Sequence, residues 1–156
     1  SEMCIRDRIK SPDRTEIVPT LISIAREELE HFEQVYELMR ARNLPLVKDE
    51  QDPYVNALLE CMRHGREQRF LDRLLVFSLV ECRGAERFGI LTRALSEPEL
   101  VRFYKQFWGA EAKHGDQFVE MALEYFDADT WLLGGQDILL HCLCGAWNHR
   151  NGHNPI

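Results

Sequence analysis

The sequence lacks any long apolar run, and this absence excludes several classes of protein. No stretch approaches the roughly 18 consecutive apolar residues that a membrane-spanning helix needs. No charged start followed by an apolar stretch marks a secretory signal. The five cysteines are odd in number and have neither disulfide nor zinc-finger spacing. We therefore expect a cytoplasmic protein in a reducing compartment, without a membrane as partner.

An excess of positive charge is also missing. The 156 residues include 19 lysines and arginines against 26 acidic residues, which gives a formal net charge of −7. Because phosphate binding favours a basic surface, this charge argues against a general nucleic-acid binder. The count is global, however, and it leaves room for a local basic patch and for carboxylates that face inward onto a metal ion.

The alternation of polar and apolar residues that marks a strand is absent as well. Apolar residues recur instead at three- and four-residue steps, which predicts helices. The first helix is expected from Glu16 until Asn43 and Pro45 end it. The apolar stripe predicted along its length consists of Leu21, Ile24, Ala25, Phe32, Val35 and Leu38. After a linker, Asp52 as N-cap and Pro53 at the first helical position begin a short helix.

Two further helices complete the predicted all-α fold. Gly65 is expected to end the short helix, and a longer helix follows over residues 68–95. Ser96 and Glu99 then form a capping box, in which Ser96 accepts a hydrogen bond from the backbone amide three residues on. The last helix begins there.

The chain is long enough for one domain with a real core. Residues 1–11 are polar, lack apolar periodicity and are interpreted as a foreign or disordered start. Residues 12–127 form the predicted helical domain. Residues 128–156 change character, with paired glycines, histidines, cysteines and a polar end, and are interpreted as an atypical tail.

Two Glu-x-x-His motifs lie on apolar faces of predicted helices. Glu28 and His31 are one turn apart on the first long helix, and Glu111 and His114 repeat this spacing on the last. Glu81, on the helix between them, is in phase with apolar residues. An ionised carboxylate turned into a core costs several kcal/mol unless it is paired or bound to a metal. Something must therefore compensate these carboxylates.

The five side chains are predicted to converge from three helices and to bind two iron ions. Di-iron bundles use one glutamate from each of two helices and a Glu-x-x-His from each of the other two. Carboxylates are hard ligands that can bridge two cations, and imidazole supplies a nitrogen to each metal. A lone Glu-x-x-His would indicate only structure, but two of them with an inward glutamate favour metal. Glu86 is a rival to Glu81, although its place near Arg83 and Arg93 favours an ion pair.

Three segments resemble the MiaE-type tRNA hydroxylases, and the resemblance spans residues 12–128. The segments are IAREELEHFEQVYELMRARNLP, LLVFSLVECRGAERFGIL and FYKQFWGAEAKHGDQFVEMALEYFD. The resemblance implies a ferritin-like four-helix bundle with two non-haem iron ions. It also implies a cytoplasmic monooxygenase that uses dioxygen, and electrons from a reductase, to hydroxylate the isopentenyl group of 2-methylthio-N6-isopentenyladenosine in tRNA. By matching position, the iron ligands would be Glu28, His31, Glu81, Glu111 and His114.

Two departures from the family qualify this expectation. The family's first core helix, which carries a sixth ligand, is expected to be missing ahead of residue 12. The segment 128–156 does not resemble the end of the family's chain. We therefore expect the chain to hydroxylate tRNA only once a glutamate-bearing helix is restored.

Two other interpretations use the same ligands: an iron-storage or peroxide-scavenging ferritin-like protein, and an inactive fragment of the hydroxylase. A storage protein has no need of a local basic strip, whereas a tRNA enzyme does. Such a strip is expected from Arg63, Arg66, Arg69 and Arg73. Candidates for an apolar substrate pocket, which are core residues in the alternative interpretation, are Phe32, Phe77, Phe88 and Phe107.

Overall fold

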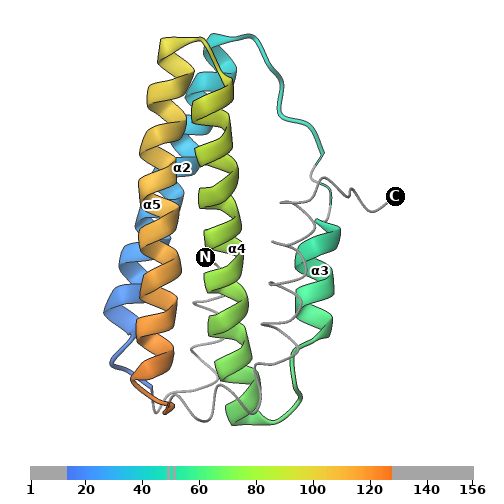
Figure 1. Cartoon of the computed structure of the whole chain (residues 1–156), viewed down its shortest axis with the longest axis vertical. Helices are drawn as coiled ribbons and strands as arrows, with labels where there is room; N and C mark the ends of the chain where they lie inside the picture. The colour runs from blue at the N-terminus through green and yellow to red at the C-terminus, as the bar shows by residue number, and fades with distance from the viewer. Residues whose placement is uncertain (1–13, 49, 51, 128–156) are drawn as a thin grey trace. The chain divides into compact units, whose positions relative to one another are not determined.

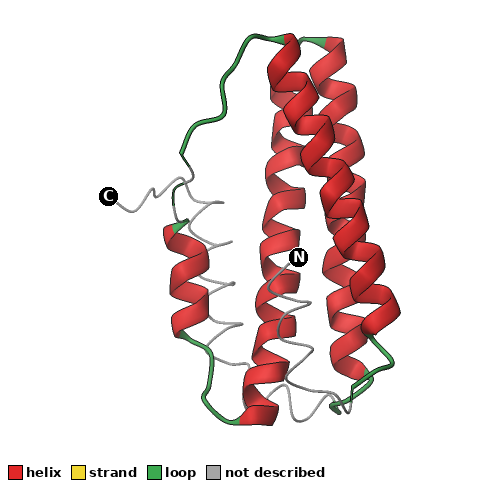
Figure 2. Ribbon diagram, turned by 180° about the vertical axis from the view of Figure 1, so that it is seen from behind, coloured by secondary structure: helices red, strands yellow, loops and turns green. Residues whose placement is uncertain are grey.

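A computed structural model describes residues 14–48, 50 and 52–127, and these contain four helices and no strand. The predicted all-α class is therefore confirmed. Loops join the helices (Figures 1 and 2). None of the described helices has the length and apolar character that crossing a membrane requires. The helices are α2 (Val18–Ala41), α3 (Pro53–Glu60), α4 (Arg66–Ala94) and α5 (Pro98–Leu123).

The chain divides into two compact units, Ser1–Glu50 and Gln51–Ile156. The first unit contains α2, and the second contains α3, α4 and α5. The domain predicted over residues 12–127 thus includes parts of both units. The predicted start, residues 1–11, and the predicted tail, residues 128–156, lie outside the described residues.

Helix α2 begins and ends close to the predicted positions. Leu21 and Ile24 are buried on its first turns. The helix ends at Ala41, and two residues later Asn43 has a φ of 55°, in the left-handed region that asparagine tolerates better than most residues. The predicted stop at Asn43 is therefore confirmed.

The apolar stripe predicted along the whole of α2 is wrong in its second half. Phe32 is 59% exposed, and Val35 is exposed as well. With 100° between successive residues, Phe32 lies about 80° around the helix from the buried Ile24, at the edge of the buried face. Burial of apolar side chains on α2 is therefore concentrated in its first two turns.

Helix α3 is short and is held at its start by Asp52. The Asp52 carboxylate accepts a hydrogen bond from the Tyr54 amide at 2.8 Å, and Pro53 takes the first helical position, as predicted. Arg83 of α4 donates to the same carboxylate at 3.1 Å and lies 3.9 Å from the ring centre of Tyr54. Burial acts to raise the pKa of Asp52, but these hydrogen bonds and the charge of Arg83 hold that pKa below its usual value. One carboxylate thus serves both α3 and α4.

Gly65 does not end α3, contrary to expectation. The helix ends at Glu60, and Gly65 is instead the extended N-cap residue of α4. The reason lies in Arg63, whose backbone amide donates to the Asp72 carboxylate at 2.8 Å. An amide bonded in this way cannot continue the hydrogen-bond ladder of α3.

The predicted capping box at Ser96 is also wrong by one residue. Helix α5 has Glu97 as its N-cap, in an extended conformation, and Glu97 makes no side-chain capping bond. Pro98 takes the first helical position because its fixed φ suits a helix start and its missing N–H would have no partner there. The proline therefore sets the start of α5.

A buried ion pair fixes the segment between α3 and α4. Asp72 of α4 is fully buried, and its carboxylate accepts from the Arg63 guanidinium at 2.6 Å and 2.9 Å and from the Arg63 amide. About a third of the Arg63 side chain remains exposed. The ion pair and the amide bond together satisfy a charge that would otherwise be costly to bury.

We expect Arg63→Ala to lower the free energy of unfolding by about 3 kcal/mol, because it leaves the buried Asp72 carboxylate with its amide bond alone. Asp72→Asn should cost less, since the Arg63 guanidinium can turn to water. Arg69→Ala, on the exposed face of α4, is the control and should change stability by less than about 0.5 kcal/mol. Urea unfolding of the three variants measures this order, and equal losses for Arg63→Ala and Arg69→Ala would contradict it.

Candidate metal centre

The second unit positions its functional side chains between α4 and α5, which run side by side in opposite directions (Figure 1). On α5, Phe107 and Phe118 are buried, and Glu111 and His114 lie between them at helical spacing. The sequence steps of four, three and four residues place all of them on one face of the helix. Glu111 and His114 therefore face inward because their apolar neighbours do.

Helix α4 repeats this arrangement around Glu81. Leu74, Ser78 and Ala85 are buried, and Glu81, which is half-buried, falls in phase with them. The spacing is again four, three and four residues. Glu81 is thus carried to the α5 side by the small and apolar residues of its own stripe, as predicted.

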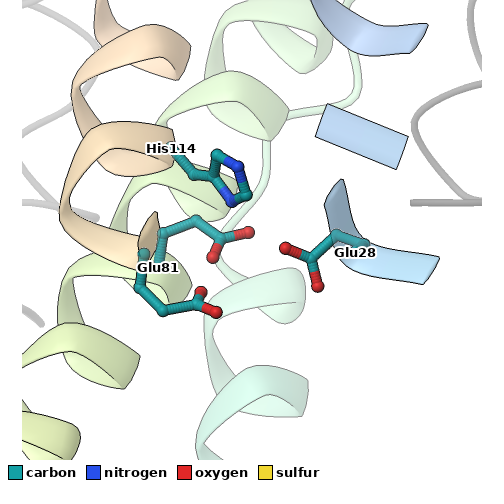
Figure 3. Close-up of side chains that lie close together, drawn as sticks. Glu28, Glu81 and His114 are labelled. Carbon is teal, nitrogen blue, oxygen red and sulfur yellow. The ribbon is translucent and has the colours of Figure 1, made fainter. Parts of the chain in front are cut away.

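Glu81, Glu111 and His114 come together as a cluster. Each offers one ligand atom, and these atoms lie within 4.8 Å of one another. His114 is fully buried and Glu111 is only 9% exposed. In Figure 3 the side chains of Glu81 and His114 extend from α4 and α5 into the same space. We call these three residues the α4–α5 cluster.

The donor set of the α4–α5 cluster fits an iron ion. Two carboxylates gathered in a poorly hydrated place repel one another, and a cation between them removes that penalty. Oxygen donors with one imidazole nitrogen suit iron. Gly84 of α4 adds to the fit, since a Cβ there would lie 3.7 Å from Oε2 of Glu111 and would fill space beside that carboxylate.

The other Glu-x-x-His motif lies on α2, in the first unit. Nδ1 of His31 is 3.4 Å from Oε1 of Glu28, so the two side chains share a face of the helix as their spacing predicted. His31 is 12% exposed and Glu28 is 31% exposed. Both are therefore more sheltered than most polar side chains of a surface helix.

The structure also separates alternatives that the sequence left open. Glu86 is exposed and takes no part in the α4–α5 cluster, so Glu81 is the inward glutamate. Of the four candidate pocket phenylalanines, Phe32 is exposed. The other three pack against aromatic rings: Phe77 against Phe118, and Phe88 against Phe107. These contacts match the alternative of core residues.

The four arginines expected to form a basic strip do not share one environment. The Arg63 guanidinium forms an ion pair with the Asp72 carboxylate. Arg66 and Arg69 are exposed on the first turns of α4, and Arg73 is half-buried one turn on. The sequence analysis did not single out Asp72. The signal for it was an acidic residue within the largely apolar segment FLDRLL.

The fold and the α4–α5 cluster define a helical protein in which two carboxylates and an imidazole lie close enough together to hold a cation. The family described as tRNA-(MS[2]IO[6]A)-hydroxylase (MiaE) has a sequence model that matches residues 4–131. The chain therefore belongs to this family. The match extends beyond residues 12–128 at both ends.

Curated relatives agree with the family match. The chain is 33% identical over 107 residues to the tRNA 2-(methylsulfanyl)-N(6)-isopentenyladenosine(37) hydroxylase of Salmonella typhimurium, covering 69% of this chain and 39% of that one. It is 35% identical over 112 residues to the enzyme of the same name from Pseudomonas putida, covering 72% of this chain and 54% of that one. The chain thus spans about half the length, or less, of these relatives.

A solved structure also resembles this chain. It is described as protein 43 with aldehyde deformylating oxygenase activity from Synechococcus. The TM-score is 0.80 at 29% sequence identity, and the likeness covers 89% of this chain and 68% of that one. The ferritin-like, all-α class predicted from the sequence is confirmed by this likeness.

Proposed function

We propose that this chain is part of a dioxygen-dependent di-iron monooxygenase that hydroxylates the isopentenyl group of 2-methylthio-N6-isopentenyladenosine in tRNA. The observation that carries the proposal is the buried α4–α5 cluster in a chain of this family. A protein that only binds tRNA needs cations on its surface, and it has no use for carboxylates and an imidazole between packed helices. The proposal places the protein in the cytoplasm, with tRNA and a reductase as partners.

We propose that the α4–α5 cluster holds one part of the metal centre and that Glu28 and His31 supply another. Support comes from the equal spacing of the two Glu-x-x-His motifs. It also comes from buried apolar residues on both helices, with Ile24 one turn before Glu28 and Phe107 and Phe118 around the motif of α5. Bundles that hold two irons use this combination of single glutamates and Glu-x-x-His pairs.

The chain's own residues would supply the setting for this chemistry. A bound iron pair supplies the activation of dioxygen with electrons from the reductase. Glu81 and Glu111 balance the charge of the metal, and His114 adds a nitrogen donor from a fully buried position. Phe107 and Phe118, buried on either side along α5, keep water from the cluster.

Iron binding tests the proposed metal centre. We expect the protein, reconstituted with Fe(II) without oxygen, to saturate at about two ions per chain, as the ligand pattern of a di-iron bundle requires. His114→Ala and His31→Ala should each weaken iron binding at least tenfold, since changes around a metal commonly cost 10–100-fold in affinity. His64→Ala, at an exposed position, is the control. Colorimetric iron assay across a titration measures the effect.

Repeating the titration in air separates the hydroxylase from a storage protein. A storage protein would continue to accumulate iron in air well beyond two ions per chain. Unchanged iron content in both His114→Ala and His31→Ala would contradict the metal centre itself.

Product formation tests the proposed reaction. Iron-loaded protein, given a reductase, dioxygen and tRNA that carries the isopentenyl-modified adenosine, is assayed for hydroxylated nucleoside by mass spectrometry of the digested tRNA. A second arm carries a glutamate-bearing helix fused ahead of Ser11, because a di-iron bundle draws a single glutamate from each of two helices. We expect product in the second arm and its loss in the fused Glu111→Gln variant. If iron is bound and neither arm yields product, the proposed reaction is contradicted.

The start of α4 carries the arginines proposed to bind tRNA. We propose that Arg66, Arg69 and Arg73, at steps of three and four residues along the start of α4, contact phosphates. Reversing all three to glutamate should weaken tRNA binding and flatten its salt dependence by a slope of about 2–3, because fewer counterions are released. Filter binding at several salt concentrations gives both numbers.

A matched control carries the same change of charge elsewhere. Arg93, Arg102 and Lys105 are exposed at the other end of α4 and on α5, and reversing them alters the net charge equally. If both triple variants lose affinity and salt dependence equally, only the global charge matters, and Arg66, Arg69 and Arg73 have no special role.

A further inference from the structure

We infer that Gly115 is a positioning residue that sets the separation of α5 from α4 at the metal ligands. The inference rests on the proposed function and concerns a residue that none of its ligand assignments includes. Gly115 is buried and directly follows His114 in α5. Whatever fixes the backbone of Gly115 therefore also fixes the starting point of the His114 side chain.

The three atoms nearest to a Cβ built on Gly115 all belong to α4. A Cβ built on Gly115 would lie 2.8 Å from Sγ of Cys82, closer than real Cβ atoms come to other heavy atoms. It would also lie 3.4 Å from the backbone oxygen of Ser78 and 3.7 Å from the backbone nitrogen of Cys82. At this point the backbones of α4 and α5 approach closely, because Gly115 places no side chain between them.

This close approach occurs beside the α4–α5 cluster on both helices. Glu81 directly precedes Cys82, and Ser78, small and buried, lies one turn before Glu81. His114 precedes Gly115, and Glu111 lies one turn further back. A side chain at position 115 must move Cys82 to another rotamer or move the helices apart. Because metal ligands must be held to within a fraction of an ångström, a shift at this point reaches all three donors.

Two other glycines near the cluster differ from Gly115 in their surroundings. Gly109 of α5 has nothing within 4 Å of its Cβ position. Gly84 of α4 would meet only the Glu111 side chain, at ordinary contact distance. Gly109→Ala and Gly115→Ala make the same gain in helix propensity, so a difference between them isolates the contact with α4.

The experiment titrates the full chain with Co²⁺ alone and records both the dissociation constant and the visible absorption of the bound ion. Gly115→Ala is expected to bind at least tenfold more weakly and with an altered spectrum, in line with the 10–100-fold effect of supporting residues. Gly109→Ala and Cys82→Ala should match the wild type. The double variant Gly115→Ala with Cys82→Ala should recover affinity and spectrum, because the clashing sulfur is gone.

Thermal unfolding of the metal-free variants accompanies the titration. A loss of unfolding temperature in Gly115→Ala with wild-type affinity and spectrum would make Gly115 a packing residue only and overturn the inference. So would weak binding that the double variant fails to recover. If Gly115→Ala alone does not fold, the double variant must fold and bind as the wild type does, or the inference falls.

The outcome for the wild type separates this inference from the function it rests on. If the wild type binds no Co²⁺, the proposed metal centre fails and the inference falls with it. If the wild type binds and Gly115→Ala binds equally well, the metal centre stands and only the role of Gly115 is overturned.

Discussion

The energetic penalty of gathering carboxylates between packed helices governs the second unit. Glu81 and Glu111 stand where their sequence neighbours are apolar or small, and His114 beside them is fully buried. Water solvates ionised groups poorly in such a place, and like charges raise the penalty further. These side chains therefore need compensation for their charge, and their ligand atoms lie close enough together for a cation to provide it. The aromatic packing along the same two helices supplies the stability that tolerates this polar centre.

The α4–α5 cluster was largely predictable from the sequence because helical periodicity is a strong signal. Two Glu-x-x-His motifs and one glutamate in phase with buried residues were enough to select Glu81, Glu111 and His114. The same reasoning placed the end of α2 and the cap of α3 correctly, since Asn43 and Asp52 act through their own local backbone. Features that depend on local chemistry were thus within reach.

The errors arose where a distant contact overrides the local signal. Gly65 was expected to end α3, but the bond from the Arg63 amide to Asp72 ends it earlier. Phe32 was assigned to a buried stripe, although whether an edge position is covered depends on the neighbouring element and not on spacing. The role of Gly115 could not be predicted from the sequence. A glycine inside a helix indicates only weak helix propensity, and its contact with Cys82 is visible only in the structure.

The Asp52 carboxylate takes part in two interactions, and this affects how α3 unfolds locally. A helix of eight residues has little stability by itself, so α3 persists through its tertiary contacts. Asp52 caps α3 and accepts from Arg83, whose guanidinium also covers the ring of Tyr54. These three interactions share members and are lost together. Amide hydrogens of α3 should therefore exchange with solvent in one cooperative step, as a single small foldon, and not by gradual fraying from the ends.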